Sequence, residues 1–128
     1  MPPQYRKEKL SSEIVRETAK ILQQELRDPR LGFVTVTKAQ VSDDLHYAKV
    51  FVSIMGDEKK KKLSMNGLKH AKGYVQAQLS RRIKTRIFPE IHFVLDESID
   101  KAFKIGKIID ELAAERKLRE SGVKSEEE

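Results

Sequence analysis

Ten basic side chains and no acidic one lie between Lys59 and Pro89. The whole chain has 26 basic and 20 acidic residues, so the remainder, with 16 basic residues against 20 acidic ones, is net negative. Lys and Arg gain affinity for a polyanion by displacing the counterions condensed on its phosphates. A solvated helix face is the plainer alternative, but such faces usually interleave both signs of charge. The segment therefore predicts nucleic-acid binding by Lys59, Lys60, Lys61, Lys62, Lys69, Lys72, Arg81, Arg82, Lys84 and Arg86.

Within this basic segment we expect the arginines to contribute more than the lysines. A guanidinium can hold a phosphate through a bidentate fork, whereas an ammonium acts as a mobile point charge. We therefore rank Arg81, Arg82 and Arg86 above the run Lys59–Lys62, which we expect at a flexible helix entry. Changing Arg81 and Arg82 together to glutamate is expected to abolish binding and to leave the fold intact.

Residues that could perform catalysis are scattered along the chain. His46, His70 and His92 fall in different predicted elements, and none has a metal-ligand spacing from another. The adjacent carboxylates Asp43 and Asp44 are more typical of a turn than of an acid pair. Cysteine is absent, which excludes disulfides, thiolate metal sites and thiol catalysis. We interpret the chain as a binding protein with no catalytic residues, no metal and no cofactor.

The first half of the chain shows one helical and two strand patterns. Apolar residues on one helical face predict a helix over residues 5–27, and Asp28-Pro29 ends it because proline disfavours helical geometry in the residue before it. Residues 33–41 and 47–54 predict two strands, and in the second small or aliphatic residues stand at every second position from Ala48 to Ile54. A short polar connection between them indicates a hairpin.

The second half is dominated by helical patterns. Gly56-Asp57 opens a long helical region, a third strand follows Pro89, and Ser98 can cap a last helix. The predicted order is α-β-β-α-α-β and then a C-terminal helix. Because the helices must cover one face of the sheet, the sequence predicts an α+β fold in two layers.

Small residues cluster in the middle of the long helical region, at Gly67, Ala71, Gly73 and Ala77. One interpretation is a single helix packed closely on the sheet, which the unbroken four-residue step of apolar positions favours. The other is a break at residues 71–73 that makes two helices. A break would present the free N–H groups of a new helix start beside three basic or polar side chains, an anion site by geometry; these are Lys69, His70 and Lys72.

The predicted order of elements is that of a type II KH domain, which clamps single-stranded nucleic acid with a G-x-x-G loop between its middle helices. Here Ala71-Lys72-Gly73 stands in that place. Three blocks also agree in order and spacing with the ribosome-binding factor A family, and the resemblance covers about residues 5–112. The blocks are DPRLGFVTVT at residues 28–37, DLHYAKVFVS at residues 44–53 and FPEIHFVLDESI at residues 88–99.

This resemblance implies a KH-like fold in which an Ala-x-Gly kink, here Ala71 and Gly73, replaces the G-x-x-G loop. It implies a function in ribosome biogenesis: binding to the immature 30S subunit through 16S rRNA near the neck and the decoding region. It also implies promotion of late maturation, including rRNA processing at the 16S 5′ end, with most importance in cold adaptation. Assembly GTPases would act with such a protein or release it.

For domain organisation we expect one KH-like RNA-binding domain over residues 1–118, including the C-terminal helix. Residues 119–128 are expected to form a disordered acidic tail, because their Ser, Gly, Lys and Glu cannot bury enough apolar surface to order the chain. No apolar run approaches the length of a membrane span. We expect a cytoplasmic monomer without a membrane partner.

Three other classes of function remain open at this point. An ordinary KH-type protein would prefer short single strands to folded rRNA. A ribonuclease acting directly on 16S rRNA would need an acid/base or metal cluster, which the sequence does not show. A basic helix could also dock on an anionic membrane or an acidic protein, which liposome flotation without RNA would reveal.

Overall fold

The computed structural model describes residues 3–31 and 33–127, without the side chains of residues 3–5, 99, 100 and 120–127. The chain divides into two compact units, Met1–Asp96 and Glu97–Glu128. In the part that the structure describes, the first unit contains the sheet and two long helices, and the second is one helix. The division thus falls before the C-terminal helix, whereas the sequence analysis placed that helix inside a domain ending at residue 118.

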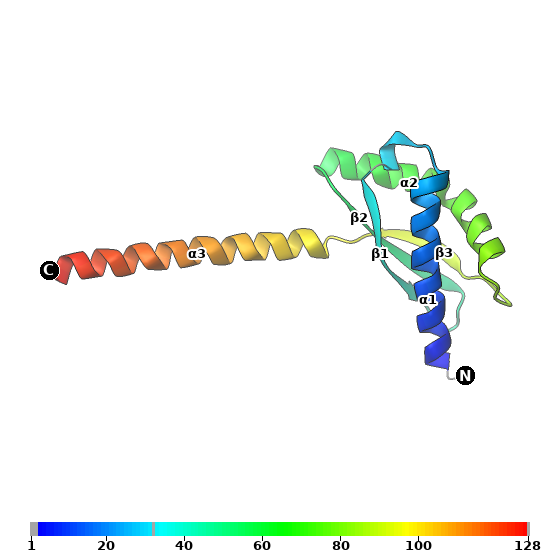
Figure 1. Cartoon of the computed structure of the whole chain (residues 1–128), viewed down its shortest axis with the longest axis horizontal. Helices are drawn as coiled ribbons and strands as arrows, with labels where there is room; N and C mark the ends of the chain where they lie inside the picture. The colour runs from blue at the N-terminus through cyan, green and yellow to red at the C-terminus, as the bar shows by residue number, and fades with distance from the viewer. Residues whose placement is uncertain (1–2, 32, 128) are drawn as a thin grey trace. The chain divides into compact units, whose positions relative to one another are not determined.

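Three strands form the sheet of the first unit, with β2 (Tyr47–Ile54) between β1 (Val34–Val41) and β3 (Glu90–Leu95). β1 runs antiparallel to β2, and β3 runs parallel to it (Figure 1). A parallel neighbour requires a crossover connection, and helix α2 (Glu58–Arg82) provides it. The predicted α+β class is confirmed, and the second predicted strand has the bounds that its alternation indicated.

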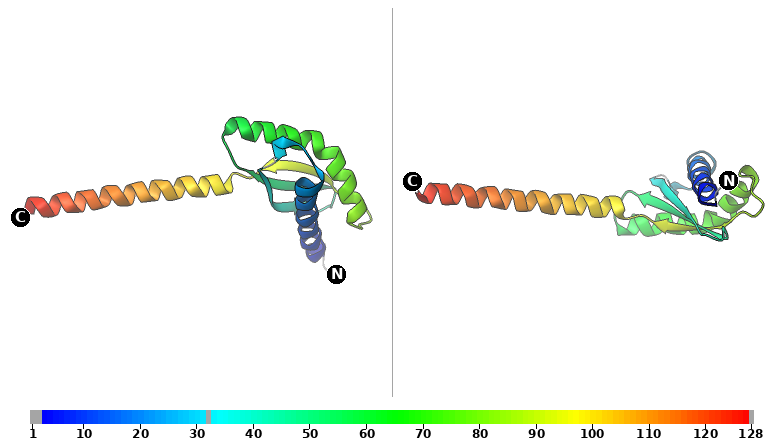
Figure 2. Two further views of the ribbon diagram at one scale, coloured as in Figure 1. Left: turned by 45° about the horizontal axis from the view of Figure 1, so that its top comes forward. Right: turned by 90° about the horizontal axis from the view of Figure 1, so that it is seen from below.

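The helices cover one face of this sheet, as expected for two layers. Along β2 the side chains alternate, with Ala48, Val50, Val52 and Ile54 buried and the residues between them exposed or half-buried. Helix α1 (Pro3–Lys20) packs against β1, helix α2 packs against β3, and the two helices contact each other. Figures 1 and 2 show α1 lying across the strands. Within the first unit, no described helix covers the other face of the sheet.

The first helix ends in two irregular turns. A π-helical turn (η1, Ile21–Glu25) continues α1, and the Leu26 N–H donates to the Ile21 carbonyl at 3.1 Å. A 3-10 turn (η2, Pro29–Leu31) follows, where Asp28-Pro29 predicted the end of the helix. The apolar face predicted from periodicity is confirmed in the core by Leu10, Ile14, Ile21 and Leu22.

Helix α2 begins at a side-chain cap and runs without interruption. The Asp57 carboxylate accepts a hydrogen bond from the Lys60 N–H at 2.9 Å, and the helix continues to Arg82. The predicted break at Ala71–Gly73, with free N–H groups at a second helix start, is therefore corrected. Instead the ribbon of α2 changes direction part-way along while staying helical (Figures 1 and 2). A local change of direction in a helix that does not end is a kink, which is the form that the resemblance implied.

The second unit is the long helix α3 (Ser98–Glu127). It extends to Glu127, and the disorder expected for residues 119–128 stays a prediction. Glu and Lys are good helix formers, so low apolar content alone does not prevent a helix there. The described large apolar side chains of α3 are exposed, which leaves this unit without a packed core; they are Phe103, Ile105, Ile108, Ile109, Leu112 and Leu118.

Candidate nucleic-acid interface

The solvent-facing side of α2 carries a stripe of cations at helical spacing. Its exposed positions recur every three or four residues, so they lie along one side of the helix. The opposite side is apolar and buried against the sheet through Leu68, Val75 and Leu79. We call the exposed stripe the α2 ridge; it consists of Lys59, Lys62, Asn66, Lys69, Gly73, Ala77 and Arg81.

The α2 ridge keeps its positive charge uncompensated. Among the described residues, neither Lys59, Lys62, Lys69 nor Arg81 forms an ion pair. Glu58 is the sole carboxylate on α2, and it lies in the first turn, where a negative charge favours the positive end of the helix dipole. An uncompensated row of cations of this kind is suited to a phosphate backbone.

Two of the predicted RNA-binding residues have carboxylate partners instead. Arg82 pairs with Glu17 of α1 at 3.6 Å and with Glu25 of η1, and its side chain is only 28% exposed. Lys72 lies 3.4 Å from a carboxylate oxygen of Glu90 and 3.5 Å from Nδ1 of His92, both on β3. Arg82 therefore fastens the end of α2 to α1, and its ranking with Arg81 as a phosphate contact stays a prediction.

The other predicted residues fall into two groups. Lys60 and Lys61 lie beside the start of the α2 ridge, in the first turns of the helix. Lys84 and Arg86 lie on the loop that follows α2, where they are exposed and line a groove together with the first half of α1. The basic segment of the sequence is therefore divided between a helix face and a separate groove.

The two glycines of α2 have different environments. A Cβ atom on Gly67 would lie 3.3 Å from atoms of both Arg30 and Leu31, so a side chain there would press on η2. A Cβ atom on Gly73 would meet no other atom within 4 Å. Gly67 thus permits the close approach of η2 to α2. No neighbouring atom requires glycine at position 73, which is the α2 ridge position with the smallest side chain.

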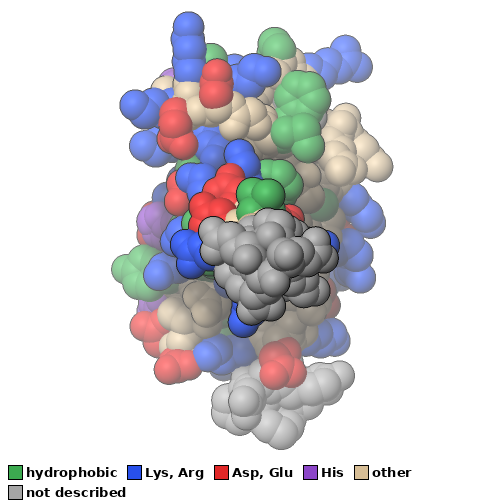
Figure 3. All heavy atoms as spheres, turned by 90° about the vertical axis from the view of Figure 1, so that its left-hand side faces the viewer, with side chains coloured by type: hydrophobic (Ala, Val, Ile, Leu, Met, Phe, Trp, Pro, Cys, Tyr) green, Lys and Arg blue, Asp and Glu red, His purple; other side chains and the backbone are tan. Residues whose placement is uncertain are grey.

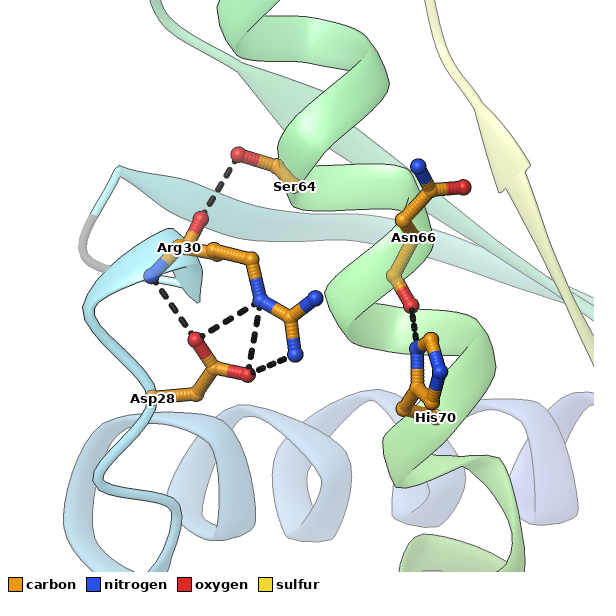
Figure 4. A network of polar contacts seen from close by, with 5 residues as sticks. All are labelled: Asp28, Arg30, Ser64, Asn66 and His70. Carbon is orange, nitrogen blue, oxygen red and sulfur yellow. Dashed lines mark hydrogen bonds and ion pairs between the residues drawn. The ribbon is translucent and has the colours of Figure 1, made fainter.

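A polar network holds η2 against α2 beside the ridge (Figure 4). The Arg30 guanidinium donates to both oxygens of Asp28, at 2.6 to 3.0 Å, and the Ser64 hydroxyl donates to the Arg30 carbonyl at 2.7 Å. His70 Nδ1 lies 2.8 Å from the Asn66 carbonyl, which can only accept, so that nitrogen carries a proton. The Arg30 side chain lowers the pKa of Asp28 through these hydrogen bonds.

Further cations lie on the open face of the sheet, outside the segment that sequence reasoning singled out. Lys38 Nζ lies 4.6 Å from the centre of the Phe51 ring, a cation–π contact. Tyr47 lies beside His92, with 6.1 Å between ring centres. Phe33, just before β1, is 66% exposed. Figure 3, which shows the left-hand side of Figure 1, has Lys and Arg side chains with carboxylates among them.

The described residues hold no group of three or more His, Asp or Glu side chains arranged to bind a metal ion. Within the same residues, no helix is both long enough and apolar enough to cross a membrane.

Comparison with known proteins shows which family the chain belongs to. The family model described as ribosome-binding factor A matches residues 6–109. The chain belongs to this family. Ribosome-binding factor A of Acetivibrio thermocellus is 47% identical over 111 residues, which cover 86% of this chain and 90% of the relative. Family membership confirms the KH-like fold.

Solved structures of the ribosome-binding factor A family resemble the chain as well. The solution structure of a putative ribosome binding factor A from Thermotoga maritima has a TM-score of 0.66 at 39% identity, covering 77% of this chain and 93% of that one. A homology model of the Thermus thermophilus ribosome binding factor A, fitted into a cryo-EM map of its 30S complex, has a TM-score of 0.56 at 28% identity. It covers 68% of this chain and 91% of that one.

Proposed function

We propose that this chain binds the immature 30S subunit through 16S rRNA and promotes late maturation of the subunit, including processing of the 16S 5′ end. The observation that carries this proposal is the α2 ridge, a row of exposed cations without ion pairs among the described residues. A similar protein, the Thermus thermophilus ribosome binding factor A, was fitted into a map of a 30S complex, which supports the same partner here.

The α2 ridge suits a folded RNA better than a short single strand. Its cations lie at intervals along one face of a bent helix (Figure 1), so they suit the phosphates of a folded backbone better than the edges of splayed bases. Gly73 and Ala77 lie between the cations and leave room for a phosphodiester backbone to approach the helix. The interface would therefore recognise the shape and charge of 16S rRNA.

The proposal has four further parts. The chain does not cleave RNA itself, and a separate nuclease cuts the precursor. Assembly GTPases act with the chain or release it from the subunit. The chain works as a cytoplasmic monomer. Its contribution is largest in the cold, when rRNA refolding is slow.

Cosedimentation with purified 30S subunits across a series of salt concentrations tests RNA binding by the α2 ridge. We expect the double variant Lys69→Gln/Arg81→Gln to lower the slope of log affinity against log salt by about two, because each phosphate contact contributes about one unit. Neither side chain has a recorded intramolecular ion pair among the described residues, so the circular dichroism spectrum should not change.

The matched control removes the same charge from the open sheet face, with Lys38→Gln/Lys49→Gln. Both residues are exposed on strands. If binding depends on net charge alone, both double variants lose affinity equally, and the α2 ridge is not the interface. If the ridge variant binds like the unmodified chain at physiological salt, the proposed mode of binding is wrong.

A further inference from the structure

A groove of about 510 Å³ lies in the first unit where the β1–β2 turn meets α1 and the loop after α2. Three segments far apart in sequence form it: the first half of α1, residues 44–46 of the turn, and residues 84–87 after α2. We infer that this groove binds one unpaired nucleotide of RNA, with its phosphate on the cationic rim and its base on an apolar floor. The inference rests on the proposed function, because the nucleotide would belong to the rRNA.

The rim of the groove is positively charged. Arg6 and Lys9 of α1 face Lys84 and Arg86 of the loop, and all four side chains are exposed. None of them has an ion pair with another described side chain. Sequence reasoning missed Arg6 and Lys9, because it singled out only the long block free of acidic residues, whereas Glu8 lies between these two.

The two carboxylates that line the groove do not cancel the positive charge of the rim. Asp44 Oδ1 accepts hydrogen bonds from the Ser42 hydroxyl at 2.7 Å and from the His46 N–H at 3.1 Å, so it serves the turn. Glu13 is half-buried one helical turn from Lys9. Four cations against two carboxylates leave a surplus of two positive charges, which is complementary to an anionic phosphodiester.

The floor of the groove is apolar. Leu10 is buried in the core, Leu45 is half-buried in the turn, and Ile87 is 65% exposed at the rim. His46 adds an imidazole to the lining. A phosphate alone would gain no binding energy from such a floor. The flat face of a nucleobase, whichever base it is, packs on apolar and aromatic side chains. The combination therefore favours a nucleotide over a free anion.

The groove is held open by contacts on all of its sides. The Lys7–Asp43 ion pair joins α1 to the turn, and the Glu90 N–H donates to the His46 carbonyl at 2.8 Å. Arg82, paired with Glu17 and Glu25, ties the end of α2 to α1 just before the loop begins. A preformed site binds without the cost of ordering its walls.

Site-specific crosslinking can test the inference, because the chain has no cysteine of its own. The cysteine of an Ile87→Cys variant is labelled with benzophenone maleimide. The complex of the labelled variant with 30S subunits is then irradiated. We expect a crosslink to an unpaired nucleotide of 16S rRNA. The matched control is Thr35→Cys, exposed at the far end of β1 from the turn, and we expect it not to reach that nucleotide.

The outcomes separate this inference from the proposed function. If the labelled variant still cosediments with 30S subunits but crosslinks to ribosomal protein, to base-paired RNA or to nothing, the groove does not hold a nucleotide and the α2 ridge remains the interface. A crosslink to an acidic protein segment would likewise overturn the inference. If the unmodified chain does not bind 30S subunits, the proposed function itself fails.

A second measurement needs no label and no ribosome. Adenosine 5′-monophosphate and inorganic phosphate are titrated separately into the full chain while methyl resonances are followed by nuclear magnetic resonance. We expect the nucleotide, and not phosphate, to shift Leu10, Leu45 and Ile87. An Ile87→Ser variant should weaken nucleotide binding at least about fivefold, the lower end of the range for one base-stacking contact. Equal shifts with both probes, or none with either, would overturn the inference.

Discussion

Replacing Gly73 by alanine separates the folding role of this residue from its binding role. A Cβ atom at this position meets nothing within 4 Å, so the methyl group adds no steric strain inside the chain. Alanine in a helix is about 1 kcal/mol more favourable than glycine, mainly because the unfolded chain loses freedom. We therefore expect the variant to be more stable by about 1 kcal/mol, or about 4–8 °C in melting temperature for a unit of this size.

The effect on binding should have the opposite sign. Gly73 is the smallest residue on the α2 ridge, and Lys69 lies one turn before it on the same side. If an RNA backbone rests against this part of the helix, a methyl group holds it off and the neighbouring cations lose their contacts. We expect Gly73→Ala to weaken binding to 30S subunits at least tenfold while it raises stability. A fluorescence titration with labelled subunits and a thermal melt measure the two effects.

Two control variants make the Gly73 result interpretable. Gly67→Ala puts a Cβ atom 3.3 Å from side-chain atoms of Arg30 and Leu31, which must shift to make room, so we expect it to gain less stability than Gly73→Ala. Ser80→Ala, exposed near the end of the helix, should change neither quantity appreciably. If Gly73→Ala binds 30S subunits with normal affinity and is simply more stable, the RNA does not approach the helix there and the argument from Gly73 is wrong.

Four other predictions follow from single features of the molecule. Thr18 has a fully buried hydroxyl without a hydrogen-bond partner in the described structure, so Thr18→Val should stabilise the chain by about 1 kcal/mol; a lower melting temperature would show that the hydroxyl is satisfied. Hydrogen bonds from Arg30 lower the pKa of Asp28 from its ordinary value of 3.8, so the stability that its carboxylate contributes is present above pH 3.8 and is lost as the pH falls through the lowered pKa. The free energies of unfolding in urea of the unmodified chain and of the Asp28→Asn variant should therefore differ at pH 7 and converge at acid pH. A difference that does not change with pH would contradict this sign. Purified chain with Mg²⁺ should not cut precursor 16S rRNA, and cleavage that a histidine-to-alanine change abolishes would refute the non-enzymatic function. Truncation after Glu120 should change the melting of the first unit by no more than about 0.5 kcal/mol, because α3 belongs to a separate unit, and a large drop would show that the tail supports the fold.

The sheet and the core could be predicted from the sequence because their patterns are local. The alternation from Tyr47 to Ile54 matches β2 residue for residue, since a half-buried strand needs an apolar side chain at every second position. The apolar face of α1 follows from a helical period in the same way. Asp57 and Ser98, with Asp28-Pro29, also mark helix ends through chemistry that acts within a few residues.

The course of α2 could not be settled from the sequence. Small residues at Gly67, Ala71 and Gly73 fit either a break or close packing, and the two interpretations differ in what lies opposite each glycine. Only the tertiary structure shows that Gly67 faces η2 and that Gly73 faces open solvent. The helix is bent but continuous. The unbroken four-residue step of apolar positions therefore predicted its backbone hydrogen bonding better than the glycine at position 73 did.

By itself, the sequence determined the sign and the place of the charge: a block of cations, a cysteine-free chain and an α+β order of elements. Which cations remain available for a partner was decided by tertiary structure alone. Arg82 meets Glu17 and Glu25, and Lys72 meets Glu90, whereas Arg81 stays exposed. The groove beside Arg86 also depends on tertiary structure, because three segments far apart in sequence line it. Ion pairing falls off within a few ångströms, so it depends on which distant segments folding brings together.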